Sequence, residues 1–316
     1  MKRFFEFLKL IRFVNLIFIA ITQLVFYYCI ISPQYTIFNS TGPILSKANL
    51  NYLILASVFI AAAGYIINDY FDLNIDRINK PHRLIIGRHI SRRWAMFFHL
   101  ILSAAGLGYT AYVSYHLRNP FLLLFNIVVV VVLVFYSTTL KRKLLSGNIL
   151  ISLLTSWVII ILYIAELDFS TGLLLSNRTH VLLKIYKIAA VYAGFAFVVS
   201  FIREIVKDME DQDGDRRNEC RTIPIVWGTA TTKLFVSAWI YILIGMLFIL
   251  LFYSFFNSWT WLVGYIVVTL LFPIFRLLKK TNAAISSSDY HQLSSLIKWI
   301  MLAGIFSMTL YYYYNR

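Results

Sequence analysis

Long apolar runs recur along the chain and alternate with short polar segments. A helix needs about 20 mostly apolar residues to cross the hydrocarbon core of a bilayer. Nine runs have about this length, at residues 13–32, 50–69, 94–115, 120–140, 147–166, 187–205, 232–254, 258–276 and 297–315. The pattern therefore predicts an all-α, polytopic membrane protein with nine transmembrane helices, and we expect residues 1–316 to form a single domain.

Two longer polar segments interrupt this pattern in the second half of the chain. Residues 167–183 predict a loop outside the membrane, and the serine-rich residues 281–296 predict a loop or a short interfacial helix. The first apolar run follows Lys2 and Arg3, as in a signal peptide, but it is too long for a signal core and has no small-residue cleavage site. We interpret it as the first transmembrane helix.

Composition and charge agree with a membrane protein. The chain is 60% hydrophobic and 14% charged, whereas soluble domains carry about 25% charged residues. Its net charge of +15 does not indicate nucleic acid, because 23 of the 29 Lys and Arg residues fall on one side of the predicted membrane. Such asymmetry places that side, with the N-terminus, in the cytoplasm. Cys29 and Cys220 form no disulfide or metal-binding pattern.

Acidic residues are concentrated in two windows, each directly after an apolar run. Ten of the 14 Asp and Glu residues lie within residues 69–76 and 204–219. The first acidic window is residues 68–76 and the second is residues 207–215, and both have aspartates at steps of three and then four: Asp69, Asp72 and Asp76, and Asp208, Asp211 and Asp215. This spacing puts three carboxylates on one face of a helix, where they repel one another unless a cation separates them.

Solvated acidic loops are the alternative to a binding site, but the spacing is helical, occurs twice and is interleaved with basic residues. Carboxylate and phosphate oxygens are the ligands that Mg²⁺ prefers. Two facing triplets could hold Mg²⁺ around one diphosphate, with nearby Lys and Arg side chains on the remaining oxygens. At a membrane edge, a diphosphate suggests a lipid whose carbon–oxygen bond is ionised beside an apolar, aromatic-lined chamber.

The two windows resemble motifs of the UbiA-type intramembrane prenyltransferases. Residues 68–76 follow the pattern N-D-x-x-D-x-x-x-D of the first motif, and residues 207–215 are similar to the second. Residues 12–15 resemble the R-P-x-N start of the first helix, with Phe13 in place of proline, and residues 136–148 resemble the third cytoplasmic segment. One departure is Leu84 after Arg83, where the family often has proline.

The resemblance implies nine helices around a central cavity with a cytoplasmic cap, and Mg²⁺ as cofactor. It implies that the six aspartates are catalytic and bind metal: Asp69, Asp72, Asp76, Asp208, Asp211 and Asp215. It further implies eight substrate-binding residues: Asn15, Asn68, Arg77, Lys80, Arg83, Lys141, Arg142 and Lys207. The expected partners are a prenyl diphosphate, a lipophilic acceptor and membrane lipid, with no nucleic acid and no obligate protein partner.

Within the family, the surroundings of both windows are most similar to geranylgeranylglycerol-phosphate geranylgeranyltransferases. This implies transfer of a geranylgeranyl group to a lipid alcohol, in a bacterial or archaeal cell membrane with the active site on the cytoplasmic side. Prenylation of an aromatic quinone precursor or of a tetrapyrrole is the alternative. A cation transporter is an alternative of another class, and it requires carboxylates near the middle of the membrane.

Overall fold

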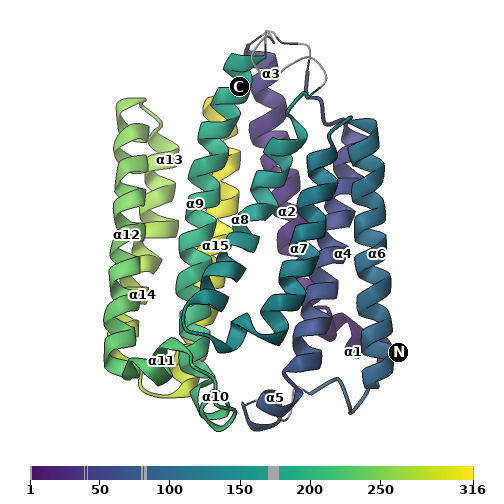
Figure 1. The fold of residues 1–316 in the computed structure, drawn as a ribbon. Helices are drawn as coiled ribbons and strands as arrows, with labels where there is room; N and C mark the ends of the chain where they lie inside the picture. Colours follow the sequence, from purple (N-terminus) through teal and green to yellow (C-terminus); the bar gives the residue numbers. More distant parts are fainter. Residues whose placement is uncertain are drawn as a thin grey trace.

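The computed structural model describes residues 2–38, 40, 42–79, 81, 84–169 and 178–315. These residues form upright helices in one bundle, with shorter helices at its ends (Figure 1). Outside the helices, the described residues have only an isolated bridge between Ile86 and Ile90. Within this part of the chain, the nine membrane-spanning helices predicted from the apolar runs are confirmed.

The spans keep the predicted order but differ in their ends. They are Phe13–Ile37 (α2, η1 and α3), Lys47–Phe71 (α4), Arg92–His116 (α6), Pro120–Thr138 (α7), Ser146–Ala165 (α8), Thr179–Glu210 (α9), Gly228–Phe256 (α12), Thr260–Ala283 (α13, η4 and α14) and Ser287–Tyr314 (α15). The shorter elements are α1 (Lys2–Leu10), α5 (Leu73–Asn79), η3 (Leu140–Arg142), α10 (Gln212–Arg217) and α11 (Ile223–Val226).

Both predictions of long polar loops are partly wrong. Helix α9 already begins at Thr179, inside the segment predicted to be a loop, while residues 170–177 lie outside the described part. Near the other segment, α14 continues to Ala283 and α15 begins at Ser287. Here Ser286 and Asp289 form a reciprocal capping box, which stabilises a polar first turn. Hydropathy marks the membrane-embedded part of a helix, whereas caps determine where the helix ends.

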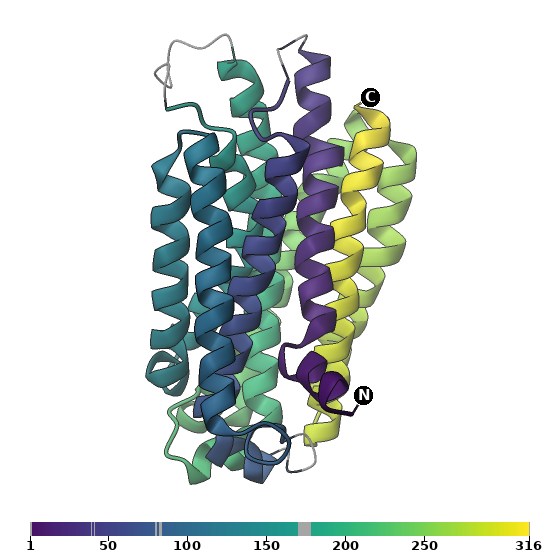
Figure 2. The same cartoon turned by 90° about the vertical axis from the view of Figure 1, so that its right-hand side faces the viewer.

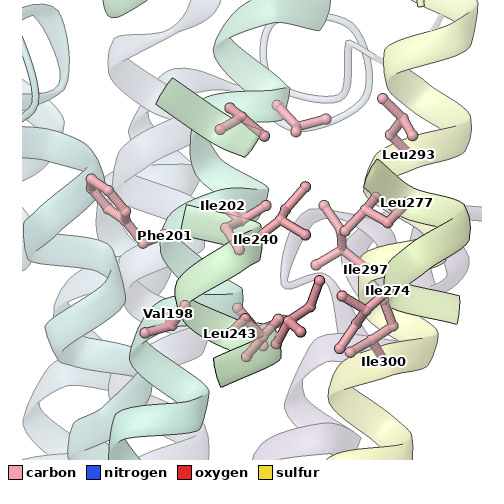
Figure 3. Packing of buried hydrophobic residues seen from close by; sticks show 14 of the residues in the cluster. Val198, Phe201, Ile202, Ile240, Leu243, Ile274, Leu277, Leu293, Ile297 and Ile300 are labelled. Carbon is pink, nitrogen blue, oxygen red and sulfur yellow. The ribbon is translucent and has the colours of Figure 1, made fainter. Parts of the chain in front are cut away.

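Buried hydrophobic side chains hold the second half of the bundle together. They come from α9, α12, α14 and α15, and include Phe201, Ile240, Ile274 and Ile297 (Figure 3). In Figure 1, α12, α13 and α14 stand at one side, with α9 and α15 between them and the remaining helices. This packing fixes α9, which carries much of the second acidic window.

The two ends of the bundle differ in chemistry. Helices α1, α5 and α10 lie at one end, which we call the motif end, and the C-terminus lies at the other (Figures 1 and 2). At the far end the fully buried Glu166 follows α8 and accepts hydrogen bonds from the Tyr35 hydroxyl (2.7 Å) and from the backbone N–H groups of Ile44 (2.9 Å) and Leu45 (3.1 Å). This carboxylate fixes the α3–α4 connection.

Candidate active site at the motif end

The first acidic window crosses from α4 to α5. Asn68 and Asp69 lie in the last turn of α4, Asp72 caps that helix, and Asp76 lies in α5. The Asp72 N–H donates to the Asn68 carbonyl (3.0 Å), and the Asp76 N–H donates to the Asp72 carbonyl (2.8 Å). The helical spacing predicted from the sequence therefore continues across the break between the two helices.

The second acidic window is built in the same way. Asp208 lies in the last turn of α9, Asp211 caps that helix, and Asp215 lies in α10. The Asp211 N–H donates to the Lys207 carbonyl (2.9 Å), and the Asp215 N–H donates to the Asp211 carbonyl (3.2 Å). In both windows the middle aspartate is thus the cap between a long helix and a short one, so the repeated spacing corresponds to a repeated structure.

The side chain of Asn79, the last residue of α5, joins the two windows. Its Nδ2 donates to the Asp211 carbonyl (2.9 Å), and its Oδ1 accepts from the Gly214 N–H (2.7 Å). A Cβ atom on Gly214 would lie 2.4 Å from that Oδ1, so only glycine permits this approach. Windows that are far apart in the sequence are therefore held against each other through one amide.

Two basic side chains from other segments neutralise carboxylates of the first window. Asp72 is 4% exposed, accepts a hydrogen bond from Asn68 Nδ2 (2.7 Å) and forms an ion pair with Lys141. Asp69 forms an ion pair with Arg12 (2.9 Å), the residue between α1 and α2. Since a buried carboxylate is costly without a partner, these pairs make the acidic face compatible with burial.

The segment that connects α7 to α8, together with the first turn of α8, contacts both windows. Lys141 in η3 is paired with Asp72 of the first window. Asn148, near the start of α8, donates from Nδ2 to a carboxylate oxygen of Asp208 in the second (2.8 Å). Asp215 is also buried, at 7% exposure. The carboxylates of both windows thus converge around one short polar segment.

Lys141 and Arg12 remain charged beside the first window. Burial by itself lowers the pKa of Lys141, but Asp72, Tyr136 and Asp76 together outweigh this effect, and the pKa of Lys141 is raised. Burial likewise lowers the pKa of Arg12, but Asp69, Tyr65 and Asp72 together outweigh it, and the pKa of Arg12 is raised. Fixed positive charge beside the carboxylates suits a site for a polyanionic group such as a diphosphate.

The remaining predicted substrate-binding residues are more scattered. Lys207 forms an ion pair with Glu204 (2.7 Å). Arg142 is exposed, and only its backbone carbonyl has a described partner, the Arg221 N–H (2.8 Å). Asn15 is half-buried in the first turn of α2.

Arg77 lines a hollow beside α5 together with Leu73 and Asn74, and its role in substrate binding stays a prediction. Lys80 and Arg83 lie outside the described residues, so their predicted roles remain predictions.

The structure adds three residues to which the sequence patterns gave no role: Arg12, Asn79 and Asn148. Each is a polar residue at the motif end of a helix. Arg12 directly precedes the first apolar run, and Asn148 lies at the start of the fifth. A search for polar residues at these ends of the apolar runs would have found both. Asn79 has no comparable signal, because its partners are the backbone groups of the second window.

The donor set fits Mg²⁺ bound together with a phosphate group. Among the described residues, no three carboxylate, imidazole or thiol groups are close enough to hold an ion by themselves. Mg²⁺ usually takes only one or two carboxylates, with waters and substrate phosphates completing its octahedron. Within the described structure, Asn68 Oδ1 is buried and has no hydrogen-bond partner, so a neutral oxygen donor stands beside the carboxylates.

Comparison with models of known protein families shows which family the chain belongs to. Residues 25–296 match the model of the UbiA prenyltransferase family. The chain belongs to this family. A UbiA relative from Methanosphaera stadtmanae, named digeranylgeranylglyceryl phosphate synthase, is 29% identical over 264 residues, which cover 82% of this chain and 88% of the relative. One of the same name from Methanothermobacter thermautotrophicus is 35% identical over 180 residues, 56% of each chain.

Solved UbiA-type structures share the fold. A structure from work on digeranylgeranylglyceryl phosphate synthase in membranes has a TM-score of 0.60 and 22% identity, and covers 98% of this chain and 99% of its own. A UbiA homologue from Archaeoglobus fulgidus bound to DMAPP and Mg²⁺ has a TM-score of 0.57 and 14% identity, with 96% and 99% covered.

These findings confirm the predicted family, the all-α membrane fold and the prenyltransferase class. The protein is an integral, multi-pass membrane enzyme. Both acidic windows lie at one end of the bundle and not at its middle, which does not support the alternative of a cation transporter. The roles of individual residues and the orientation in the membrane stay predictions.

Proposed function

We propose that this UbiA enzyme transfers a geranylgeranyl group from its diphosphate to the free hydroxyl of a geranylgeranylglyceryl phosphate-type lipid. The observation that carries the proposal is the convergence of both acidic windows on one polar segment, through Lys141–Asp72 and Asn148–Asp208. The names of its relatives, digeranylgeranylglyceryl phosphate synthase, support the acceptor. A membrane with the motif end in the cytoplasm agrees with the predicted charge asymmetry.

The metal role is assigned to the two triplets, Asp69, Asp72, Asp76, Asp208, Asp211 and Asp215. When bound there, Mg²⁺ would neutralise diphosphate oxygens and so favour cleavage of the allylic carbon–oxygen bond. Asn68 adds a neutral oxygen, and Lys141 places a positive charge beside Asp72. Arg12 holds Asp69 in position.

The reaction balances without a further co-reactant. The allylic carbon–oxygen bond breaks, and diphosphate leaves with the electron pair. The acceptor hydroxyl oxygen forms a new bond to that carbon and loses its proton to the released diphosphate or to a carboxylate of the windows. Lys207, paired with Glu204, and the exposed Arg142 are assigned to the rim, where they would meet outer diphosphate oxygens.

Product analysis tests the proposal directly. Purified protein, Mg²⁺ and labelled geranylgeranyl diphosphate are incubated separately with geranylgeranylglyceryl phosphate and with an aromatic quinone precursor, and products are identified by mass. We expect an ether product from the glycerol lipid and none after chelation of Mg²⁺. A product from the aromatic acceptor alone would overturn the assigned acceptor, and no transfer to either would overturn the proposed function.

Carboxylate variants test the site. Asp72→Ala and Asp211→Ala should each lose transfer while they keep the elution volume and helical content of the wild type. Asp213→Ala is the matched control, because Asp213 lies in the second window but is exposed and outside the triplet; it should retain activity. Full activity of either triplet variant would remove that aspartate from the site.

A further inference from the structure

Two adjoining hollows lie on the outer side of the first acidic window. The larger, about 450 Å³, runs along the start of α6, and the smaller, about 250 Å³, reaches over α5 to the turn at Gly87. They share Tyr70 and Arg92 and so form one groove. Its lining residues come mainly from the end of α4, from α5 and from the start of α6, and these parts of the chain lie at the motif end (Figure 1).

The groove is cationic at its outer part. Arg92 and Arg93 line the larger hollow, and Arg77 lines the smaller. The Arg92 guanidinium stacks on the Tyr70 ring, 4.6 Å from its centroid. None of the three arginines forms an ion pair with a described residue, and no described Asp or Glu lines either hollow. Three exposed positive charges thus stand there without an acidic partner among the described residues.

Further along α6 the lining becomes apolar. Met96, Phe97 and Leu100 follow the arginines on the same side of the helix. At 1.5 Å per residue, Leu100 lies about 12 Å further along the axis of α6 than Arg92, in the direction of the far end of the bundle. The order of the groove, positive at the membrane edge and apolar toward the interior, is the order of an anionic lipid with its headgroup outside and its chains within.

The groove is separate from the candidate active site. The metal-site carboxylates Asp69 and Asp72 pair with Arg12 and Lys141 and line neither hollow. A ligand in this groove would contact Tyr70, Arg77 and Arg92, and neither of these carboxylates lines its hollows. The proposed ligand is therefore distinct from the reacting prenyl diphosphate and from the reacting acceptor.

We propose that this groove binds the phosphate headgroup of an anionic phospholipid from the surrounding membrane, with one acyl or prenyl chain along Met96, Phe97 and Leu100. Charge complementarity and the polar-to-apolar order select this occupant. A free phosphate would leave the apolar part of the groove unused. The bound lipid would join α5 to the start of α6 and so stabilise the backbone that carries the first window.

Arginines at a membrane edge also serve topology without binding any particular lipid. In that case any exposed basic pair at the motif end should attract anionic lipid equally. The two explanations therefore differ in whether the position of the charge matters, and a matched pair of charges outside the groove separates them.

Native mass spectrometry in a non-ionic detergent makes this comparison. The probes are dioctanoyl phosphatidylglycerol, the zwitterionic dioctanoyl phosphatidylcholine, and glycerol phosphate without chains. Three proteins are compared: the wild type, the groove variant and the control. The groove variant carries both Arg92→Gln and Arg93→Gln. The control carries both Arg276→Gln and Lys279→Gln, which remove the same charge from an exposed face of α14.

The wild type and the control should retain one phosphatidylglycerol, bound more tightly than phosphatidylcholine, and should not retain glycerol phosphate. The groove variant should bind phosphatidylglycerol at least tenfold more weakly, since each basic residue near a membrane surface contributes about 1 kcal/mol toward an anionic lipid. Equal losses in the two variants, or equal binding of both lipids by the wild type, would overturn the proposal. If the groove variant does not fold, Arg77→Gln decides, with weaker binding in support and unchanged binding against.

Discussion

The bridge formed by Asn79 offers a sharp test of how the two acidic windows are positioned. Replacing Asn79 with alanine removes the hydrogen bonds to the Asp211 carbonyl and from the Gly214 N–H. At a net value of about 1 kcal/mol each, the two bonds contribute about 2 kcal/mol. If the two bonds form only when the windows are in the reactive arrangement, their loss lowers kcat/KM by about thirtyfold.

The same bridge can be broken from its other side. Gly214→Ala places a Cβ atom 2.4 Å from Asn79 Oδ1, so the Asn79 side chain must move and its bonds are lost. In the Asn79→Ala background this clash disappears. The double variant should therefore be no worse than Asn79→Ala alone, whereas independent effects would multiply.

Initial rates with labelled geranylgeranyl diphosphate, measured over a range of Mg²⁺ concentrations, check this cycle. Asn257→Ala is the control, because Asn257 is exposed at the far end and its amide donates only to the Tyr253 carbonyl (2.8 Å). The bridging role of Asn79 would be refuted if Asn79→Ala kept the wild-type kcat/KM at every Mg²⁺ concentration. It would also be refuted if the losses of the two single variants multiplied in the double variant.

Three further predictions concern single positions. Lys141→Ala should raise KM for the prenyl diphosphate more than it lowers kcat, and Lys141→Arg should restore part of the loss. Steady-state kinetics check this prediction. An unchanged KM with a lost kcat would reassign Lys141 to the chemical step. Gly304→Ala should destabilise the protein by about 1–3 kcal/mol, since a Cβ there lies 2.4 Å from the Phe195 ring. Gly245→Ala is the control, because its Cβ meets no atom within 4 Å. Equal melting temperatures of the two variants in detergent would contradict this prediction. Glu166→Ala should lower the free energy of unfolding by about 3 kcal/mol or more, because three donors lose their acceptor. Glu166→Gln should lower it less, and transfer per folded molecule should be unchanged in both variants. Reduced specific activity would instead link the far end to the site.

Hydropathy predicted the number and order of the spans because the membrane imposes about 20 apolar residues on each crossing. It could not predict that α9 extends from Thr179 to Glu210, since the end of this helix that bears the second window is polar. The same limit explains the error at Ser287, where a capping box begins α15 well before its apolar part. Helix ends depend on local hydrogen bonds, which hydropathy does not measure.

The spacing of the aspartates predicted their common face but not their partners. Steps of three and four determine where Asp72 and Asp211 stand on a helix, and these local relations are visible in the sequence. Arg12, Asn79 and Asn148 reach the windows only through the packing of helices that are remote in the sequence. A spacing rule contains no information about such contacts.

The acidic spacing alone suggested that a bound metal must offset the repulsion within each triplet. The structure shows that Lys141 and Arg12 already offset part of it, and that η3 and the first turn of α8 bind Asp72 and Asp208. Asp69, Asp72 and Asp208 therefore have protein partners before any metal is bound. Under the proposed function, few carboxylates would be needed, because Mg²⁺ would share its coordination with phosphate.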